Sequence, residues 1–122
     1  MDIYESGQMY LETILVLKKE KGNVHAVDIC EHLGFAKSSV SGALSALKEK
    51  GYISVVRGSI MLTEKGEAMA KSIYERHHVI TRYLVGLGVS EETASEDACR
   101  MEHTLSEETY RIFKSIVEAK EN

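Results

Sequence analysis

The amino-acid sequence predicts a mainly helical protein that carries one small β-hairpin. Apolar residues recur at helical spacing along most of the 122 residues, which is the pattern of amphipathic helices. Residues 52–62 differ, because they are rich in β-branched and apolar side chains and contain a short polar turn. The chain also lacks proline, which suits uninterrupted helices.

Three helices are expected in the first fifty residues, over 7–21, 28–33 and 38–50, and each is followed by a glycine. Serines at the start of the third helix are favourable capping residues. The glycines are Gly22, Gly34 and Gly51. The residues expected to face the core are Met9, Leu11, Ile14, Leu15 and Leu17 in the first helix, and Val40, Ala43, Leu44 and Leu47 in the third.

A hairpin and three further helices complete the chain. The strands are expected over 52–56 and 60–62, with a tight turn at 57–59 between them. The first helix after the hairpin is expected to be long and to run to about residues 86–88, and the next two extend through His103 and Ala119. Their expected N-terminal caps are Thr63, Ser90 and Ser106.

Composition and charge restrict the class of function. The net charge is −4, but residues 1–87 hold 11 basic and 10 acidic side chains, whereas residues 88–122 hold 4 and 9. Residues 35–60 carry four cations and one acid, so the basic charge is local. No apolar run approaches the roughly 20 residues that span a bilayer, and the N-terminus lacks the pattern of a signal peptide. We therefore expect a cytoplasmic protein with no membrane partner.

Residues 26–50 follow the helix-turn-helix pattern, and the hairpin directly after them makes the unit a winged helix. The second helix of this motif begins with small polar residues, which let a helix approach the major groove closely. Arg57 lies at the tip of the wing, where a cation can reach phosphate or the minor groove. The residues expected to contact double-stranded DNA are Lys37, Ser38, Ser39, Ser41, Gly42, Lys48 and Arg57.

Each of these residues taken singly is better explained as a capping serine or a solvated lysine. The whole succession of helix, glycine turn, serine-rich helix, β-ribbon and tip arginine favours DNA binding. Winged helices also serve as protein-interaction modules, so the fold alone does not settle the function.

A second cluster indicates a metal. Cys99, Glu102 and His103 are spaced i, i+3 and i+4, so a helix presents all three on one face. A thiolate, a carboxylate and an imidazole suit a divalent transition metal better than Mg²⁺ or Ca²⁺. One helix cannot complete the coordination shell with three ligands. The candidates elsewhere in the chain are His77, Met9 and Glu12.

Each candidate ligand also has an ordinary explanation. A lone methionine is more often core filling than a ligand, single glutamates are usually solvated, and a histidine can pair on the surface. In a cytoplasmic chain, Cys30 and Cys99 are expected to be free thiols or ligands and not a structural disulfide. Only agreement among three separate segments makes the metal hypothesis strong.

Over nearly its whole length, and in consistent order, the chain resembles the DtxR/MntR family of iron- and manganese-dependent repressors. The resemblance implies a winged-helix DNA-binding domain over 1–70, and a helical metal-binding and dimerisation domain over 71–122, with metal bound between them. It also implies a homodimer on a palindromic operator. The stretches that carry it are Met9-Tyr10-Leu11-Glu12-Thr13-Ile14, Lys37-Ser38-Ser39-Val40-Ser41, Leu62-Thr63-Glu64-Lys65-Gly66, Arg76-His77-His78 and, most strongly, Asp97-Ala98-Cys99-Arg100-Met101-Glu102-His103-Thr104-Leu105-Ser106.

The family resemblance also implies a ligand set. Iron-responsive members use Met, Cys, Glu and His. Manganese-responsive members have Asp and Glu at the Met and Cys positions, and they also use a further Glu and a His on the long helix. This chain is a hybrid, because its sulfur ligands are iron-like and its further Glu and His are those of the manganese type. The implied cofactor is therefore Fe²⁺ or Mn²⁺, with Zn²⁺, Co²⁺ or Ni²⁺ also accepted in vitro; the sulfur ligands favour iron. The implied ligands are Met9, Glu12, His77, Cys99, Glu102 and His103. Thr81 and Ser95 stand at two positions of the ancillary site of iron-type members, so that site is not expected in its usual form.

The expected function is therefore a metal-dependent transcriptional repressor that controls iron or manganese homeostasis. No second acid–base pair or phosphate loop suggests an enzyme or a small organic substrate. One alternative is a metal-independent winged-helix regulator that senses an organic ligand or thiol oxidation at Cys99. Another is a helical metal-binding or protein-interaction module that does not bind DNA.

Overall fold

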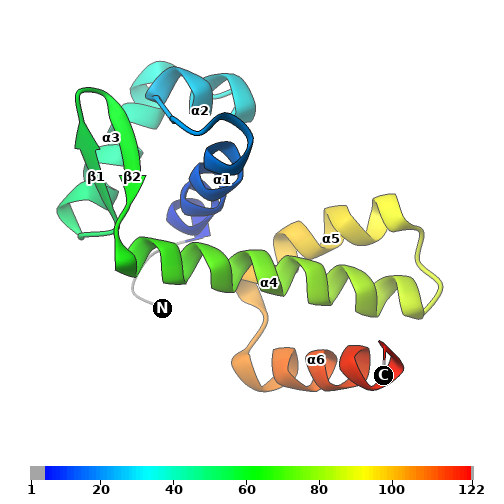
Figure 1. Ribbon diagram of the computed structural model, residues 1–122. Helices are drawn as coiled ribbons and strands as arrows, with labels where there is room; N and C mark the ends of the chain where they lie inside the picture. The colour runs from blue at the N-terminus through cyan, green and yellow to red at the C-terminus, as the bar shows by residue number, and fades with distance from the viewer. Residues whose placement is uncertain (1–4, 122) are drawn as a thin grey trace. The chain divides into compact units, whose positions relative to one another are not determined.

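The computed structural model describes residues 5–121 (Figure 1). They form two compact units, an N-terminal unit that ends at Lys71 and a C-terminal unit that begins at Ser72. Six helices and one two-stranded antiparallel sheet make up this part of the chain. The predicted class, mainly α with a small β-wing, is confirmed. Among the described residues, no helix is both long and apolar enough to cross a membrane.

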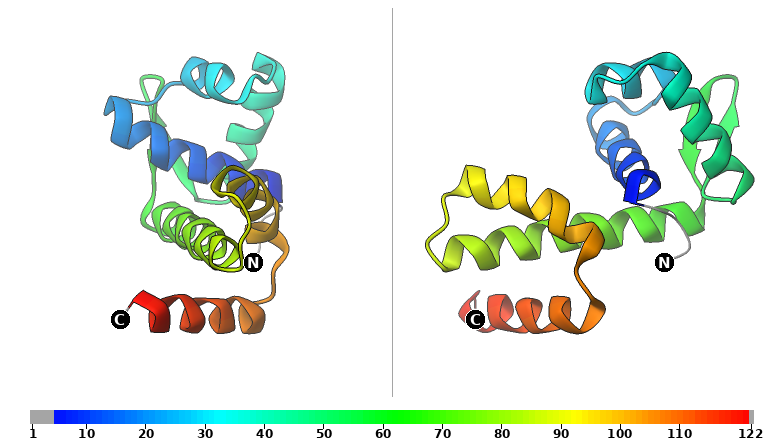
Figure 2. Two further views of the ribbon diagram at one scale, coloured as in Figure 1. Left: turned by 90° about the vertical axis from the view of Figure 1, so that its right-hand side faces the viewer. Right: turned by 180° about the vertical axis from the view of Figure 1, so that it is seen from behind.

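The N-terminal unit is a winged helix-turn-helix. Its elements are α1 (Glu5–Lys21), α2 (Ala26–Leu33), α3 (Lys37–Glu49), β1 (Ile53–Val56), β2 (Ser59–Leu62) and the start of α4 (Glu64–Gly86). Helix α1 contacts α2, α3 and β2, and α3 contacts α2 and β1 (Figures 1 and 2). The core residues expected on α1 and α3 are buried, except that Met9 and Ala43 keep part of their surface.

Helix α2 begins at Ala26, two residues earlier than expected. The backbone N–H of His25 donates to Asp28 Oδ2 at 2.8 Å, and Lys21 Nζ lies 3.0 Å from Asp28 Oδ1. These bonds lower the pKa of Asp28, with the backbone bond from His25 as the main cause and the Lys21 bond next. Asp28, the third residue of α2, thus caps the N-terminus of this helix. Residues 26 and 27, which were expected to precede the helix, therefore belong to its first turn.

Helix α3 corrects the sequence prediction at its start. The N-cap is Ala36, which has no side-chain acceptor, and Ser38 and Ser39 lie inside the first turn with exposed side chains. The predicted serine caps are therefore wrong. The helix begins one residue earlier than expected, because Val40 N already bonds to Ala36 O at 3.1 Å.

The wing turns through Arg57 and Gly58, both with positive φ, at 53° and 79°. Two successive left-handed residues form the type I′ turn whose twist matches a β-hairpin. At the base of the wing, a Cβ on Gly66 would collide with the carbonyl oxygen of Tyr52. Glycine at this place therefore lets the first turn of α4 lie against the backbone of Tyr52, the residue before β1.

The C-terminal unit consists of the rest of α4 with α5 (Glu91–Thr104) and α6 (Glu107–Glu121). Helices α5 and α6 lie along two sides of α4 (Figures 1 and 2). Tyr83 of α4 stacks on Phe113 of α6, with ring centroids 4.0 Å apart. The predicted caps are confirmed, because backbone N–H groups donate to the hydroxyls of Thr63, Ser90 and Ser106.

Candidate metal centre and nucleic-acid interface

The candidate metal centre is built on a buried carboxylate between two imidazoles of the C-terminal unit. Glu102 of α5 has no exposed surface. Its Oε2 lies 2.9 Å from Nδ1 of His77 on α4, and its Oε1 lies 3.3 Å from Nε2 of His103. The Glu102 carboxylate thus has an imidazole nitrogen near each of its oxygens. His103 is its neighbour on α5, and His77 comes from α4, so the arrangement depends on the packing of α5 against α4.

The other predicted ligands lie elsewhere. Cys99 is on α5, one turn before Glu102 and His103, and is exposed. Met9 and Glu12 are on α1 in the N-terminal unit, three residues apart and each partly exposed. In residues 5–121, no group of three or more His, Cys, Asp or Glu side chains is already arranged to hold a metal ion.

The chemistry of the donor set fits a divalent transition metal. Imidazole nitrogen with carboxylate oxygen suits manganese, iron and zinc. The short His77–Glu102 and His103–Glu102 contacts show that three of the six predicted ligands lie within a few ångströms of one another. In the geometry described here, Glu102 hydrogen-bonds to His77 and lies close to His103, so binding a metal would replace these contacts with coordination.

Arg76 holds the end of α5 that carries these groups. Its Nη1 donates to the carbonyl oxygens of Glu102 and Leu105 at 3.1 and 2.8 Å, and its Nη2 donates to Glu107 Oε2 at 3.0 Å. Its side chain is only 5% exposed and lies 4.8 Å from the centre of the Tyr110 ring. Bonds from Arg76 and then Arg111 lower the pKa of Glu107. Sequence analysis did not predict this role, because an isolated arginine gives no spacing pattern.

Two hydroxyls contact His77. Thr81 Oγ1 donates to the His77 carbonyl at 2.7 Å, and Ser95 Oγ lies 3.3 Å from His77 Nε2. In the sequence, Thr81 and Ser95 are recognisable only as departures from the iron-type pattern. No spacing signal predicts the contact of Ser95 with the ring.

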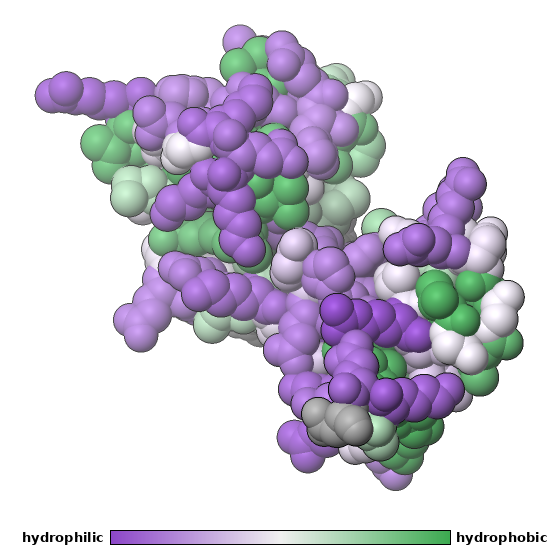
Figure 3. Space-filling model, turned by 45° about the vertical axis from the view of Figure 1, so that its right-hand side comes forward, coloured by the Kyte–Doolittle hydropathy of each residue, from purple (hydrophilic) through white to green (hydrophobic). Residues whose placement is uncertain are grey.

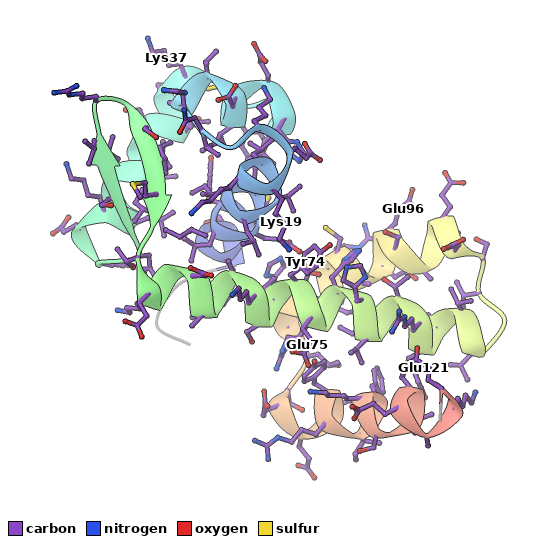
Figure 4. All side chains as sticks on the ribbon, viewed as in Figure 1. Lys19, Lys37, Tyr74, Glu75, Glu96 and Glu121 are labelled. Carbon is purple, nitrogen blue, oxygen red and sulfur yellow. The ribbon has the colours of Figure 1, made fainter. Side chains whose placement is uncertain are left out.

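The candidate nucleic-acid interface lies on α3 and the wing. All seven predicted contact residues are exposed, and Lys37 projects from the beginning of α3 (Figure 4). An added Cβ at Gly42 would meet no atom within 4 Å. Gly42 is therefore not required for packing within this unit, and its lack of a side chain leaves the outer face of α3 open.

The surface around these residues is polar and locally basic. The face in Figure 3 is largely hydrophilic, with apolar side chains confined to separate patches. On α3 and the wing, Lys37, Lys48, Lys50 and Arg57 are exposed and Glu49 is the acidic neighbour. This charge suits a phosphate backbone despite the acidic total.

Comparison with known proteins identifies the family. The model of the iron-dependent repressor N-terminal DNA-binding domain matches residues 2–58, and that of the iron-dependent repressor metal-binding and dimerisation domain matches residues 63–121. The transcriptional regulator MntR of Escherichia coli O6:H1 is 39% identical over 107 residues, which cover 86% of this chain and 68% of that protein. The chain belongs to the iron-dependent repressor family. The resemblance drawn from its motifs is thereby confirmed.

Other metal-dependent repressors are similar over most of the chain. The iron-dependent repressor IdeR of Mycobacterium bovis is 32% identical over 118 residues, covering 95% of this chain and 51% of IdeR. A manganese-dependent transcriptional repressor solved in complex with manganese superposes with a TM-score of 0.84 at 24% identity, covering 92% of this chain and 52% of the other. The chain thus spans about half the length of these two proteins. Family membership does not favour the metal-independent alternative.

Proposed function

We propose that this protein is a metal-dependent transcriptional repressor, controlling iron or manganese homeostasis, that binds a palindromic operator as a homodimer when Fe²⁺ or Mn²⁺ is bound. The observation that carries the proposal is the buried Glu102 carboxylate between His77 and His103, in a chain that also holds an exposed winged helix. A regulator of this kind acts where the DNA is, so we place it in the cytoplasm. It needs no catalytic residue and no small organic substrate.

We propose that α3 reads the major groove and that the wing contacts the backbone. Small side chains at Ser38, Ser39, Ser41 and Gly42 allow close approach, and their hydroxyls can bond to base edges or phosphates. Lys37, Lys48 and Arg57 supply cations for phosphate contacts, which carry affinity but little sequence information. These assignments rest on exposure, size and charge.

We propose one ligand set of six side chains. His77, Glu102 and His103 already lie close together, and Cys99 joins them from the preceding turn of α5. In this proposal Met9 and Glu12 supply the ligands from α1. The domain over 1–70 and the domain over 71–122 then each contribute ligands to the same metal. When bound, the metal supplies a cross-link between these side chains. The sulfur donors favour Fe²⁺, and the two glutamates with His77 keep Mn²⁺ acceptable.

Metal binding raises the affinity for operator DNA through the ligands that this chain supplies. Ligation restrains the winged helix of each protomer, and two restrained recognition helices fit successive major grooves. Metal must favour the DNA-competent arrangement for this to work. A coupling of about 1–3 kcal/mol gives roughly 5–150-fold tighter operator binding.

Dimerisation fits the apolar surface of the C-terminal unit. Val85 in the last turn of α4 and Leu87 just after this helix are 42% and 63% exposed. Ile112 and Ile116 on α6 are 55% and 37% exposed. A groove of about 310 Å³ lies between the ends of these helices and is lined in part by Val85, Ile116 and Val117. We propose this face as part of the homodimer contact.

A metal-titrated DNA-binding assay tests the proposed function. Duplexes covering the DNA upstream of the protein's own gene are titrated with protein in Fe²⁺, Mn²⁺, Zn²⁺ or a chelator. We expect one palindromic segment to bind at least fivefold more tightly with Fe²⁺ or Mn²⁺ than with chelator. Equal affinity under all conditions would overturn the proposal and favour the metal-independent regulator, and absence of any specific binding would favour a module that has lost DNA binding.

A further inference from the structure

The His77 ring lies between two side chains of α5 that differ in hydrogen-bonding character. Its Nδ1 is 2.9 Å from Glu102 Oε2, and its Nε2 is 3.3 Å from Ser95 Oγ. Ser95 and Glu102 are seven residues apart, so both lie on the face of α5 that meets α4. The ring therefore has a defined partner at each nitrogen.

The two partners assign the proton on the ring. A neutral imidazole has one N–H donor and one lone pair, and a carboxylate can only accept. In a neutral ring, the Glu102 carboxylate beside Nδ1 favours the proton on Nδ1, and Nε2 then accepts a hydrogen bond from the Ser95 hydroxyl. A metal ligand at Nδ1 needs the opposite tautomer, in which Nδ1 offers its lone pair and Nε2–H donates.

A hydroxyl can serve both tautomers, because it is both donor and acceptor. We propose that Ser95 is a positioning residue of the metal centre. Its hydroxyl donates to His77 Nε2 when Nδ1–H bonds to Glu102, and accepts from Nε2–H when Nδ1 binds metal. The proton moves from one ring nitrogen to the other, and no proton is gained or lost by the ring. Ser95 thus holds the ring in one place while its tautomer changes.

This role explains why a small hydroxyl suits position 95. A carbonyl or carboxylate there would accept from Nε2–H but could not donate in the other tautomer, and an alanine would leave Nε2 without this bond. The inference rests on the proposed metal site, since it assigns His77 Nδ1 as the ligand atom. Outer bonds of this kind typically change metal affinity by about 10–100-fold.

Two measurements on the full chain test the inference, with Zn²⁺ as a diamagnetic probe. The first is nitrogen NMR of ¹⁵N-histidine-labelled protein, which reports the tautomer of His77 with and without Zn²⁺. The second is the Zn²⁺ affinity of wild type, Ser95→Ala, Ser95→Thr and the neighbouring control Glu96→Ala. Thermal unfolding of each metal-free variant establishes that it is folded.

We expect the proton of His77 on Nδ1 in the metal-free protein and on Nε2 with Zn²⁺. Ser95→Ala should weaken Zn²⁺ binding about 10–100-fold, Ser95→Thr should restore it, and Glu96→Ala should leave it unchanged. Unchanged affinity in Ser95→Ala, or a proton that stays on Nδ1 with Zn²⁺ bound, would overturn the inference alone. Failure of the wild-type protein to bind Zn²⁺ would overturn the proposed metal site together with it.

Discussion

Glu102 is the residue on which the metal proposal depends most. A glutamate is almost never fully buried unless it is paired, and burying an isolated carboxylate is very costly. Here the carboxylate has an imidazole near each oxygen, His77 at 2.9 Å and His103 at 3.3 Å. A divalent cation could therefore bind the Glu102 carboxylate in place of its present contacts with the two imidazoles.

Replacing Glu102 with glutamine tests this charge. Glu102→Gln keeps the size of the side chain but removes the anionic donor. We expect Mn²⁺ affinity, measured by calorimetry, to fall more than about 100-fold, since even outer-sphere changes cost about 10–100-fold. Glu96→Gln is the matched control, because Glu96 projects from the same helix on the side away from α4 (Figure 4). A Glu102→Gln protein that binds Mn²⁺ as wild type does would remove Glu102 from the ligand set.

Gly42 gives a test of the recognition surface. A Cβ there would meet only open space, and glutamine is a better helix former than glycine. Gly42→Gln should therefore raise the free energy of unfolding by about 0.5 kcal/mol, as measured by urea titration. It should also weaken operator binding about tenfold, because its side chain blocks groove contacts worth about 1–3 kcal/mol. A stabilised variant with full operator affinity would show that this face of α3 does not approach DNA.

At the scale of elements, the wing combines a strained turn with a single cation. Arg57 adopts a φ of 53° beside Gly58, a conformation that asparagine accepts more readily than arginine does. Arg57→Asn therefore removes the charge without harming the hairpin, and Arg57→Lys keeps the charge. The two variants separate the electrostatic role of the tip from its structural role.

We expect Arg57→Asn to weaken binding to all DNA sequences alike. The slope of log affinity against log salt should become shallower by about one for each wing that contacts phosphate. Arg57→Lys should retain the wild-type slope. An Arg57→Asn slope equal to that of the wild type would mean that the wing tip does not touch the backbone.

The contact between α4 and α6 has its own pH signature. Tyr110 donates to Glu75 Oε1 at 3.1 Å, and burial first, then the charge of Glu75, raises its pKa to about 12. The folded state therefore holds this proton more tightly than the unfolded chain does. The resulting stability is complete below about pH 10 and is lost as pH rises towards 12.

Ultraviolet titration of tyrosinate checks this value, as the difference between the wild type and Tyr110→Phe. We expect that difference to show a single titration near pH 12. The variant should lose less unfolding free energy between about pH 10 and 12 than the wild type. A Tyr110 that titrates near pH 10 in the folded protein would contradict the buried bond to Glu75.

For the whole molecule, the sequence was sufficient where periodicity and local chemistry decide the structure. Apolar spacing, glycine stops and capping residues together located the six helices in the part of the chain that the structure describes, and the Ser90 and Ser106 caps followed from side-chain chemistry. The predicted serine cap of α3 was wrong, because the N-cap position is occupied by Ala36, and the serines lie inside the helix. The contacts of Arg76 and Ser95 also escaped prediction, since they join α4 to α5 and depend on packing that no local pattern encodes.

The candidate site divides in the same way. The i, i+3, i+4 spacing correctly put Glu102 and His103 on one helix, but it treated Cys99 as their equal, whereas Cys99 is exposed and Glu102 is fully buried. The contact between His77 and Glu102 could not be predicted from the sequence, because it depends on how α4 packs against α5. The contributions of Met9 and Glu12 stay predictions drawn from the family pattern.

The central claim is that one metal centre and one DNA surface are coupled, and coupling is reciprocal. The most direct test is to measure Mn²⁺ or Fe²⁺ affinity by calorimetry with and without the operator duplex, and operator affinity with and without that metal. We predict that both ratios agree and lie between about 5 and 150, and that both fall to one in Glu102→Gln. Metal that binds equally well with and without operator would contradict the claim.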